Sequence, residues 1–84
     1  MPLKEVYVTK KFEQNIKSVK DKSILKKLKT QIEKIRDEPE TGKPLRHMLK
    51  GERTIYVKPY RLIYSVDDDT LILLRFMHRK KVYK

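Results

Sequence analysis

The feature that most constrains the fold of this chain is a pair of apolar runs in its C-terminal half, separated by three consecutive acidic residues. The runs span Tyr60–Val66 and Thr70–Tyr83, and the acidic residues are Asp67–Asp69. Adjacent carboxylates are poorly tolerated inside a strand and are easily accommodated in a turn. The pattern therefore predicts an antiparallel hairpin with an acidic turn.

Cationic side chains interrupt this apolar hairpin and mark it as a candidate site. Arg61 stands at the start of the first run, and Arg75 interrupts the second. Because side chains alternate between the two faces of a strand, Arg75 and Arg79 share one face. If the register places that face beside Arg61, three guanidiniums converge on one open sheet surface, where we expect an anionic group to dock.

The charge balance also indicates an anionic partner. The 84 residues include 22 Lys and Arg against 11 Asp and Glu, which gives a formal net charge of +11. Self-repulsion at this density destabilises a compact chain, so a nucleic acid or an acidic protein is the expected partner. The alternative is a charge-laced surface of the kind found in thermophile proteins, which leaves the basic C-terminus unexplained.

Length and composition predict one domain, residues 1–84, with a small core. The absence of cysteine excludes a disulfide framework and thiolate zinc sites, and it favours a reducing compartment. No apolar run approaches the ~20 residues of a membrane-spanning helix, and the basic N-terminus lacks the apolar segment of a signal peptide. We therefore expect a soluble, cytoplasmic protein that does not associate with membranes.

The N-terminal half carries the signals of one strand and two helices. Lys4–Val8 alternates charged and apolar residues, which predicts a half-buried strand. Thr9 is the candidate N-cap of a helix over Lys10–Lys20, and Asp21–Ser23 offers caps for a second helix that Pro39 ends. The two apolar stripes are Phe12, Ile16 and Val19, and then Ile24, Leu25, Leu28, Ile32 and Ile35. A break this short predicts an antiparallel helical hairpin.

The remaining segments complete the predicted architecture. A loop over residues 40–44 and an ambiguous segment over Leu45–Leu49, in which His47 is expected to be structural, precede an alternating strand at Arg53–Lys58. The resulting order is strand, helix, helix and three hairpin-linked strands. This order predicts an α+β two-layer sandwich (β-α-α-β-β-β), in which the helical hairpin covers one face of a mainly antiparallel sheet. We expect the function on the other face.

Two sequence blocks resemble the RelE/ParE superfamily of type II toxins, and its RelE-like branch in particular. Residues 60–64 (YRLIY) match the YRxxY block of that family, and residues 78–83 (HRKKVY) match its terminal HRxxVY block. The element order resembles the family along essentially the whole chain. The resemblance implies a ribosome-dependent endoribonuclease that cleaves messenger RNA, silenced by a small acidic antitoxin protein. We expect the antitoxin to lie on the exposed, cationic sheet surface.

The resemblance also implies roles for individual residues. Arg61 matches the phosphate-binding arginine, Arg79 the arginine near the scissile bond, and Tyr83 the terminal tyrosine, while His78 stands where several relatives have a catalytic histidine. The predicted RNA-binding residues are Arg53, Tyr56, Lys58, Arg75, Lys80 and Lys81. Where the family has two lysines in the preceding strand, this chain has Thr54 and Tyr56, so the general base is left open.

The chemistry of RNA cleavage is consistent with these residue types and with the lack of a metal or cofactor. Attack by the RNA's own 2′-hydroxyl requires a base, an acid and cations around the phosphate. His78 is a candidate base or acid, and Tyr83 is a candidate acid. The carboxylates of Asp67–Asp69 point in different directions and have no nearby histidine, so we expect a solvated turn and no metal site.

Simpler explanations exist for each candidate. Arg61 is able to pair with the acidic turn, Arg75 to support the exposed sheet face, and His78 and Tyr83 to pack the C-terminal segment. Two other functions also fit the fold. One is a non-catalytic, ParE-like poison of DNA gyrase, which usually lacks the arginine, histidine and tyrosine set. The other is a non-toxic, basic nucleic-acid-binding module.

Overall fold

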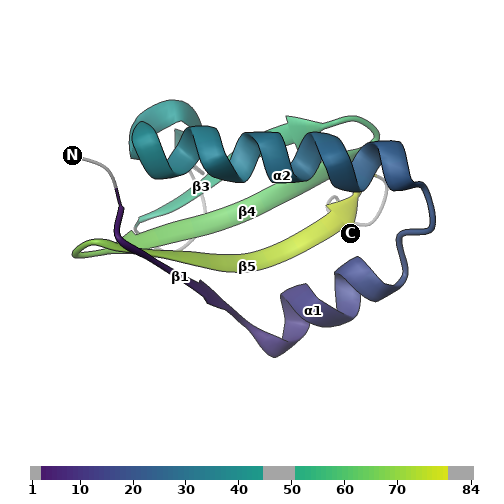
Figure 1. The fold of residues 1–84 in the computed structure, drawn as a ribbon, viewed down its shortest axis with the longest axis horizontal. Helices are drawn as coiled ribbons and strands as arrows, with labels where there is room; N and C mark the ends of the chain where they lie inside the picture. The colour runs from purple at the N-terminus through teal and green to yellow at the C-terminus, as the bar shows by residue number, and fades with distance from the viewer. Residues whose placement is uncertain (1–2, 45–50, 80–84) are drawn as a thin grey trace.

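The fold is one mixed sheet with two helices on one of its faces. It is seen in a computed structural model that describes residues 3–44 and 51–79. The elements are β1 (Glu5–Val8), α1 (Lys10–Lys17), α2 (Lys22–Asp37), the 3-10 helix η1 (Pro39–Thr41), β2 (Lys43–Pro44), β3 (Glu52–Val57), β4 (Tyr60–Asp67) and β5 (Thr70–His78). The strands form a five-stranded sheet in the order β1-β5-β4-β3-β2 (Figure 1).

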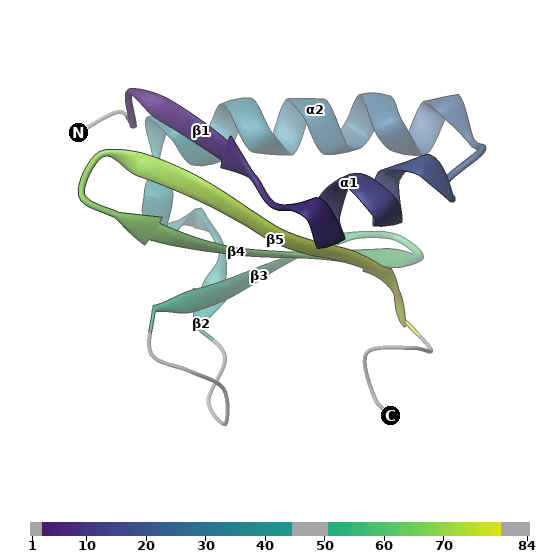
Figure 2. The ribbon, with the colours of Figure 1, turned by 90° about the horizontal axis from the view of Figure 1, so that it is seen from below.

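The layer arrangement confirms the predicted α+β sandwich. Strand β1 pairs parallel to β5, and the other neighbouring strands pair antiparallel. Helices α1 and α2 lie on the same side of the sheet, and within residues 3–44 and 51–79 no helical element covers the opposite side (Figure 2). We call the covered side the helix face and the other side the open face. Parallel strands need a long connection between them, and the two helices and three other strands supply it between β1 and β5.

Both predicted helix caps are confirmed. The hydroxyl of Thr9 accepts a hydrogen bond from the Phe12 amide at 3.2 Å, and it donates to the Leu73 carbonyl at 2.9 Å. The start of α1 is thereby attached to β5. The Asp21 carboxylate accepts from the Ser23 amide at 2.9 Å, and hydrogen bonds from Ser23 lower the pKa of this carboxyl. Each cap satisfies an amide that the first helical turn leaves without a partner.

Helix α1 is shorter than the sequence predicts. It ends at Lys17, three residues before the expected end at Lys20, and Ser18 occupies the C-cap. The hydroxyl and the amide of Ser18 both donate to the Asn15 carbonyl, which tightens the last turn. Val19 still enters the core, although it lies outside the helix.

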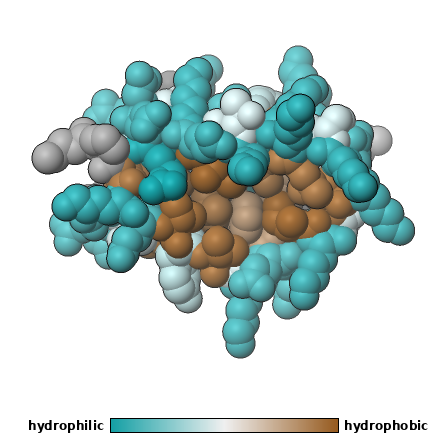
Figure 3. Space-filling model, in the orientation of Figure 1, coloured by the Kyte–Doolittle hydropathy of each residue, from teal (hydrophilic) through white to brown (hydrophobic). Residues whose placement is uncertain are grey.

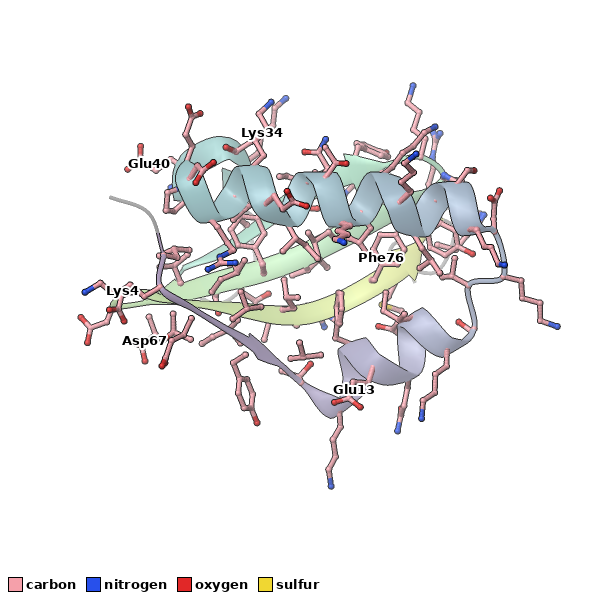
Figure 4. The ribbon with its side chains drawn as sticks, viewed as in Figure 1. Lys4, Glu13, Lys34, Glu40, Asp67 and Phe76 are labelled. Atoms are coloured by element: carbon pink, nitrogen blue, oxygen red, sulfur yellow. The ribbon has the colours of Figure 1, made fainter. Side chains whose placement is uncertain are left out.

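The core lies between the helix face and the two helices. The largest side chains that are completely buried are Tyr64, Phe76, Ile35, Leu62 and Leu71. The ring of Phe76 lies 4.9 Å from the ring of Tyr60 and 6.5 Å from that of Phe12, measured between centroids. Figure 4 shows Phe76 on β5 in the space between α1 and α2. Strand β5 and both helices therefore share one apolar cluster.

Strands β1 and β2 differ from the sequence prediction. All four residues of β1 are exposed, with Val6 and Val8 37% and 38% exposed, because β1 is an edge strand that neighbours only β5. The stretch predicted as a loop contains η1 and the two-residue strand β2, which pairs Lys43 with Thr54. His47 and the rest of residues 45–50 lie outside the described residues.

A buried tyrosine attaches the η1–β2 segment to the sheet. The Tyr64 hydroxyl donates to the Pro39 carbonyl at 2.8 Å and accepts from the Gly42 amide at 2.9 Å. Burial raises the pKa of this phenol. The Arg53 guanidinium donates to the Gly42 carbonyl at 2.7 Å. Together these hydrogen bonds fix the position of Lys43 beside β3.

The close approach of Tyr64 to Gly42 predicts the effect of a substitution there. A β-carbon at Gly42 would lie 2.6 Å from the hydroxyl oxygen of Tyr64 and 2.8 Å from a ring carbon. We expect Gly42→Ala to lower the free energy of unfolding by about 1–3 kcal/mol, as overpacking does, measured by urea denaturation. In a Tyr64→Phe background the hydroxyl is absent, so the same substitution should cost less. Equal stability of Gly42→Ala and wild type would contradict this packing.

Candidate nucleic-acid interface

The register of the central hairpin places two of the predicted arginines on the open face. Arg61 pairs with Met77, and Ile63 pairs with Arg75. Paired residues in an antiparallel sheet point to the same face, so Arg61 and Arg75 share it. The register of the β4–β5 pair shifts between Ile63 and Tyr64, which indicates a β-bulge at this point. The sequence pattern could not decide whether Arg61 and Arg75 share a face, and the register shows that they do.

Arg79 follows β5 directly. Its side chain is exposed, and its backbone amide donates to the Pro59 carbonyl at 2.8 Å, which continues the β4–β5 pairing by one step. Arg79 is no longer part of the strand, because the backbone turns helical at this residue, so strand alternation does not assign its side chain to a face. The third guanidinium of the predicted group thus lies at the end of the hairpin that carries Arg61.

Tyr56 and Arg61 form a contact that the sequence pattern does not reveal. They are direct partners across β3 and β4. The Arg61 guanidinium carbon lies 4.7 Å from the centroid of the Tyr56 ring, and Nη2 donates to the phenol oxygen at 3.1 Å. Cation–π attraction and the hydrogen bond both restrict the guanidinium. The Tyr56 side chain is nevertheless 44% exposed, so much of this aromatic surface is accessible.

The acidic turn does not neutralise Arg61. Asp67 is at the opposite end of β4 from Arg61, roughly 20 Å away at the rise of a strand. Figure 4 shows Asp67 at the end of the sheet that also carries Lys4. Asp68 has a φ of 56°, a left-handed conformation that suits a turn and that aspartate tolerates. The predicted turn is confirmed, and the simple explanation for Arg61 fails on distance.

Arg75 supports the open face through an ion pair. Its Nη2 lies 3.3 Å from the Glu52 carboxylate, which reaches it from β3 across β4. The residue between them, Ile63, is only 3% exposed although it lies on the open face. The Nε atom of Arg75 is buried and makes no hydrogen bond among the described residues. The pair therefore covers Ile63 and leaves less of the Arg75 charge for a ligand.

His78 lies on the opposite face from Arg61. It pairs with Tyr60, and the imidazole packs edge-on against the Tyr60 ring at 5.4 Å between centroids. Tyr60 in turn stacks on Phe76, which belongs to the core of the helix face. The sequence groups His78 with Arg61, whereas the register places these two side chains on opposite faces of the sheet. This geometry matches the simpler explanation, in which His78 packs.

The other predicted RNA-binding residues are distributed differently. Arg53 lies on the helix face and donates to Gly42, so it has a structural contact in place of the expected exposed one. Lys58 is exposed in the turn between β3 and β4. Lys80, Lys81 and Tyr83 lie outside the described residues.

A recess at the edge of β3 borders the Tyr56–Arg61 contact. It has a volume of about 380 Å³. Its lining residues come from α2, η1, β2, β3 and β4. They are Gln31, Thr41, Lys43, Thr54, Ile55, Tyr56 and Arg61. Sequence reasoning missed Gln31, Thr41 and Lys43 as site residues. No local signal identifies them, because the η1–β2 segment brings distant parts of the chain together.

The described part of the chain holds neither a cluster of metal-binding side chains nor a helix able to cross a membrane. Within residues 3–44 and 51–79, no three His, Asp or Glu side chains are grouped closely enough to hold a metal ion. Neither helix in these ranges has the length and apolar character that crossing a bilayer requires.

Sequence comparison relates the chain to bacterial and archaeal toxins. A family profile described as "ParE toxin of type II toxin-antitoxin system, parDE" matches residues 6–83. The putative toxin RelE4 of Methanocaldococcus jannaschii is 33% identical over 70 residues, which cover 80% of this chain and 74% of that protein. Toxin RelG of Mycobacterium tuberculosis is 42% identical over 45 residues, which cover 51% of this chain and only 52% of RelG.

Structural comparison agrees with the sequence comparison. The toxin–antitoxin complex RelBE2 from Mycobacterium tuberculosis contains a chain that superimposes with a TM-score of 0.77 at 28% identity. The match covers 94% of this chain and 100% of that one. The sheet order, the uncovered open face and the profile match along nearly the whole sequence lead to the same assignment. The chain belongs to the RelE/ParE superfamily of toxins from type II toxin–antitoxin systems.

Proposed function

We propose that this toxin is an endoribonuclease that cleaves messenger RNA on its open face, at the ribosome, through the RNA's own 2′-hydroxyl. The observation that carries the proposal is the Arg61 guanidinium, which lies on a sheet surface without a covering helix and is restricted by Tyr56. Exposed Arg79 at the end of the same hairpin supplies a second guanidinium. The family includes toxins of different activities, and this cationic pair favours a phosphate ligand.

The arginines account for the electrostatic part of the reaction. During 2′-hydroxyl attack, negative charge grows on the phosphate oxygens, and preformed cations stabilise it. A guanidinium stays charged and offers a planar pair of donors that match two phosphate oxygens. In the proposal, Arg61 holds the phosphate and Arg79 stabilises the charge near the scissile bond. The Tyr56 contact reduces the freedom that the Arg61 side chain has to lose on binding.

The proposal also assigns the side chains that transfer protons. The packing of His78 against Tyr60 favours a structural role for the imidazole, so the proposal does not use it as the base. We retain Tyr83 as the general acid on the strength of the family resemblance. Tyr56 is the titratable group that the structure brings into contact with Arg61, at the position where the family has a lysine, and we propose that it takes part in activating the 2′-hydroxyl.

Substitution of the two arginines tests the proposed centre. Arg61→Ala and Arg79→Ala should each remove most growth inhibition, measured after induced expression. The thermal unfolding midpoint should change little, because exposed guanidiniums contribute little to folding. Arg36→Ala is the matched control, since Arg36 is an exposed arginine in the last turn of α2. Full toxicity of Arg61→Ala or of Arg79→Ala would refute the assignment.

The nature of the cut ends tests the reaction. We expect cleavage to persist in EDTA once the ribosomal complex is assembled, because 2′-hydroxyl attack needs no metal-activated water. The 5′ fragment should carry a 2′,3′-cyclic phosphate, and a single 2′-deoxy nucleotide at the scissile position should prevent cleavage. Intact transcripts together with double-strand DNA breaks would instead identify a gyrase poison. Cleavage of the 2′-deoxy substrate would exclude the mechanism.

An antitoxin is the proposed protein partner, and we propose the helix side of the molecule as its docking surface in place of the cationic sheet surface that the sequence predicts. Figure 3 shows a continuous apolar band between α2 and the edge formed by α1 and β1. The elements bordering this band carry partly exposed apolar side chains: Val6, Val8, Ile16, Leu25 and Ile32. The open face is richer in polar side chains. We therefore propose that an acidic, amphipathic antitoxin segment packs its apolar side on the band, beside the lysines of both helices.

One substitution on β1 separates this docking surface from the open face. Val8→Asp places a negative charge on the apolar band, so it should weaken the antitoxin complex at least tenfold in a titration calorimetry experiment. Tyr7→Ser, on the same strand and the opposite face, is the control and should bind normally. Affinity should also fall as salt rises, because the helices carry many exposed lysines. Normal binding of Val8→Asp would rule out the band as the docking surface.

A further inference from the structure

We propose that the recess at the edge of β3 is a subsite for one unstacked nucleobase of the RNA, next to the phosphate held by Arg61. The inference rests on the proposed function and extends it from the phosphate to the base beside it. Tyr56 and Arg61, which contact each other, both line the recess. A nucleotide whose phosphate lies on Arg61 therefore has its base within reach of the recess.

The walls of the recess combine aromatic, apolar and hydrogen-bonding groups. Tyr56 and Ile55 supply an aromatic and an apolar surface, and Tyr56 is substantially exposed. Single-stranded RNA is recognised by stacking bases on aromatic rings and by hydrogen bonds to their edges. Lys43 and Arg61 are the cations among its lining residues and the remaining walls are uncharged, so the recess offers an aromatic and polar surface beside the cation proposed to hold the phosphate.

Several polar groups are placed to recognise the edge of a base. Gln31 offers an amide donor and acceptor from α2, and Lys43 offers an ammonium group from β2. The Thr54 hydroxyl oxygen is buried and has no hydrogen-bond partner among the described residues. Because this oxygen is buried, Gln31 and Lys43 are the side chains that carry the recognition of the base edge.

The backbone of β3 adds to this polar wall. The Thr54 carbonyl oxygen would lie 3.0 Å from a β-carbon at Gly42, so it points toward β2. Residues two apart in a strand direct their backbone groups to the same side, which directs the amide and carbonyl of Tyr56 toward this edge as well. Strand β2 pairs only with Arg53 and Thr54, so it does not extend alongside Tyr56. The recess lies where β2 ends.

This arrangement also gives a physical reason for the residues that replace the family's paired lysines. Thr54 and Tyr56 both line the recess, and both lie on the open face. A tyrosine and a threonine provide stacking and a hydroxyl group where two lysines would provide charge. The substitution therefore favours contact with a base over additional contact with phosphate.

Removing the base from the RNA tests the subsite separately from cleavage. The probe is a short RNA with a 2′-deoxy nucleotide at the scissile position, in an intact form and in a form with an abasic nucleotide beside that position. Binding to the full-length toxin is measured by fluorescence anisotropy. We expect the wild type to bind the abasic form about 5- to 150-fold more weakly, the range that stacking of one base on an aromatic side chain supplies.

Three variants locate the effect in the recess. Gln31→Ala should weaken binding of the intact RNA and leave binding of the abasic RNA unchanged. Tyr56→Leu should weaken the intact RNA more than the abasic RNA, because Tyr56 also restricts Arg61, whereas Tyr56→Phe should keep most of the preference for the intact form. Gln14→Ala, an exposed glutamine on α1, is the control and should behave as the wild type. Equal losses on both RNAs for Tyr56→Leu and Gln31→Ala would overturn the subsite.

A fourth variant distinguishes failure of the subsite from failure of the proposed function. Arg61→Ala should weaken binding of both RNAs strongly, because both contain the phosphate that Arg61 is proposed to hold. If Arg61→Ala has this effect and the wild type does not discriminate between the two RNAs, the subsite is wrong and the phosphate site stands. If neither RNA binds the wild type, both proposals fall.

Discussion

The antiparallel pairing of β4 with β5 is the interaction on which the rest of this structure depends. These strands occupy the middle of the sheet, and their register decides which residues enter the core and which face solvent. Leu62 and Phe76 are paired and buried under the helices, while the adjacent pair, Arg61 and Met77, lies on the open face. A slip of one residue would exchange these sets. The burial of Phe76 and Leu62 therefore also fixes the position of the cationic site.

The core and the candidate site are coupled through the hydroxyl of Tyr64. This side chain follows the register shift in the β4–β5 pair, lies on the helix face, and forms hydrogen bonds with Pro39 and Gly42. The segment it holds contains Lys43, which borders the recess beside Arg61. The site thus has two supports, the register of the central hairpin and the attachment of η1 and β2. Residues far apart in the sequence meet there, held by strand pairing and by the hydrogen bonds of Tyr64.

Much of the fold could be predicted from sequence because its signals are local. The caps at Thr9 and Asp21, the proline after α2 and the acidic turn each act within a few residues of themselves. The site was predicted less completely, because strand alternation and register are properties of pairs of strands. Arg61 and His78 belong to the two sequence blocks that the resemblance groups in one site, yet the register places them on opposite faces. The Tyr56–Arg61 contact similarly depends on the β3–β4 register, which no single segment encodes.

The central claim is that RNA lies on the open face of the sheet, and methyl NMR tests it most directly. The toxin would be labelled at methionine and isoleucine methyl groups and titrated with a short RNA that a 2′-deoxy nucleotide makes resistant to cleavage. Met77 and Ile63 flank Arg61 on the open face, whereas Ile16 and Ile32 belong to the helices. The account predicts shifts at Met77 and Ile63 with Ile16 and Ile32 unchanged. Shifts confined to Ile16 and Ile32 would contradict it.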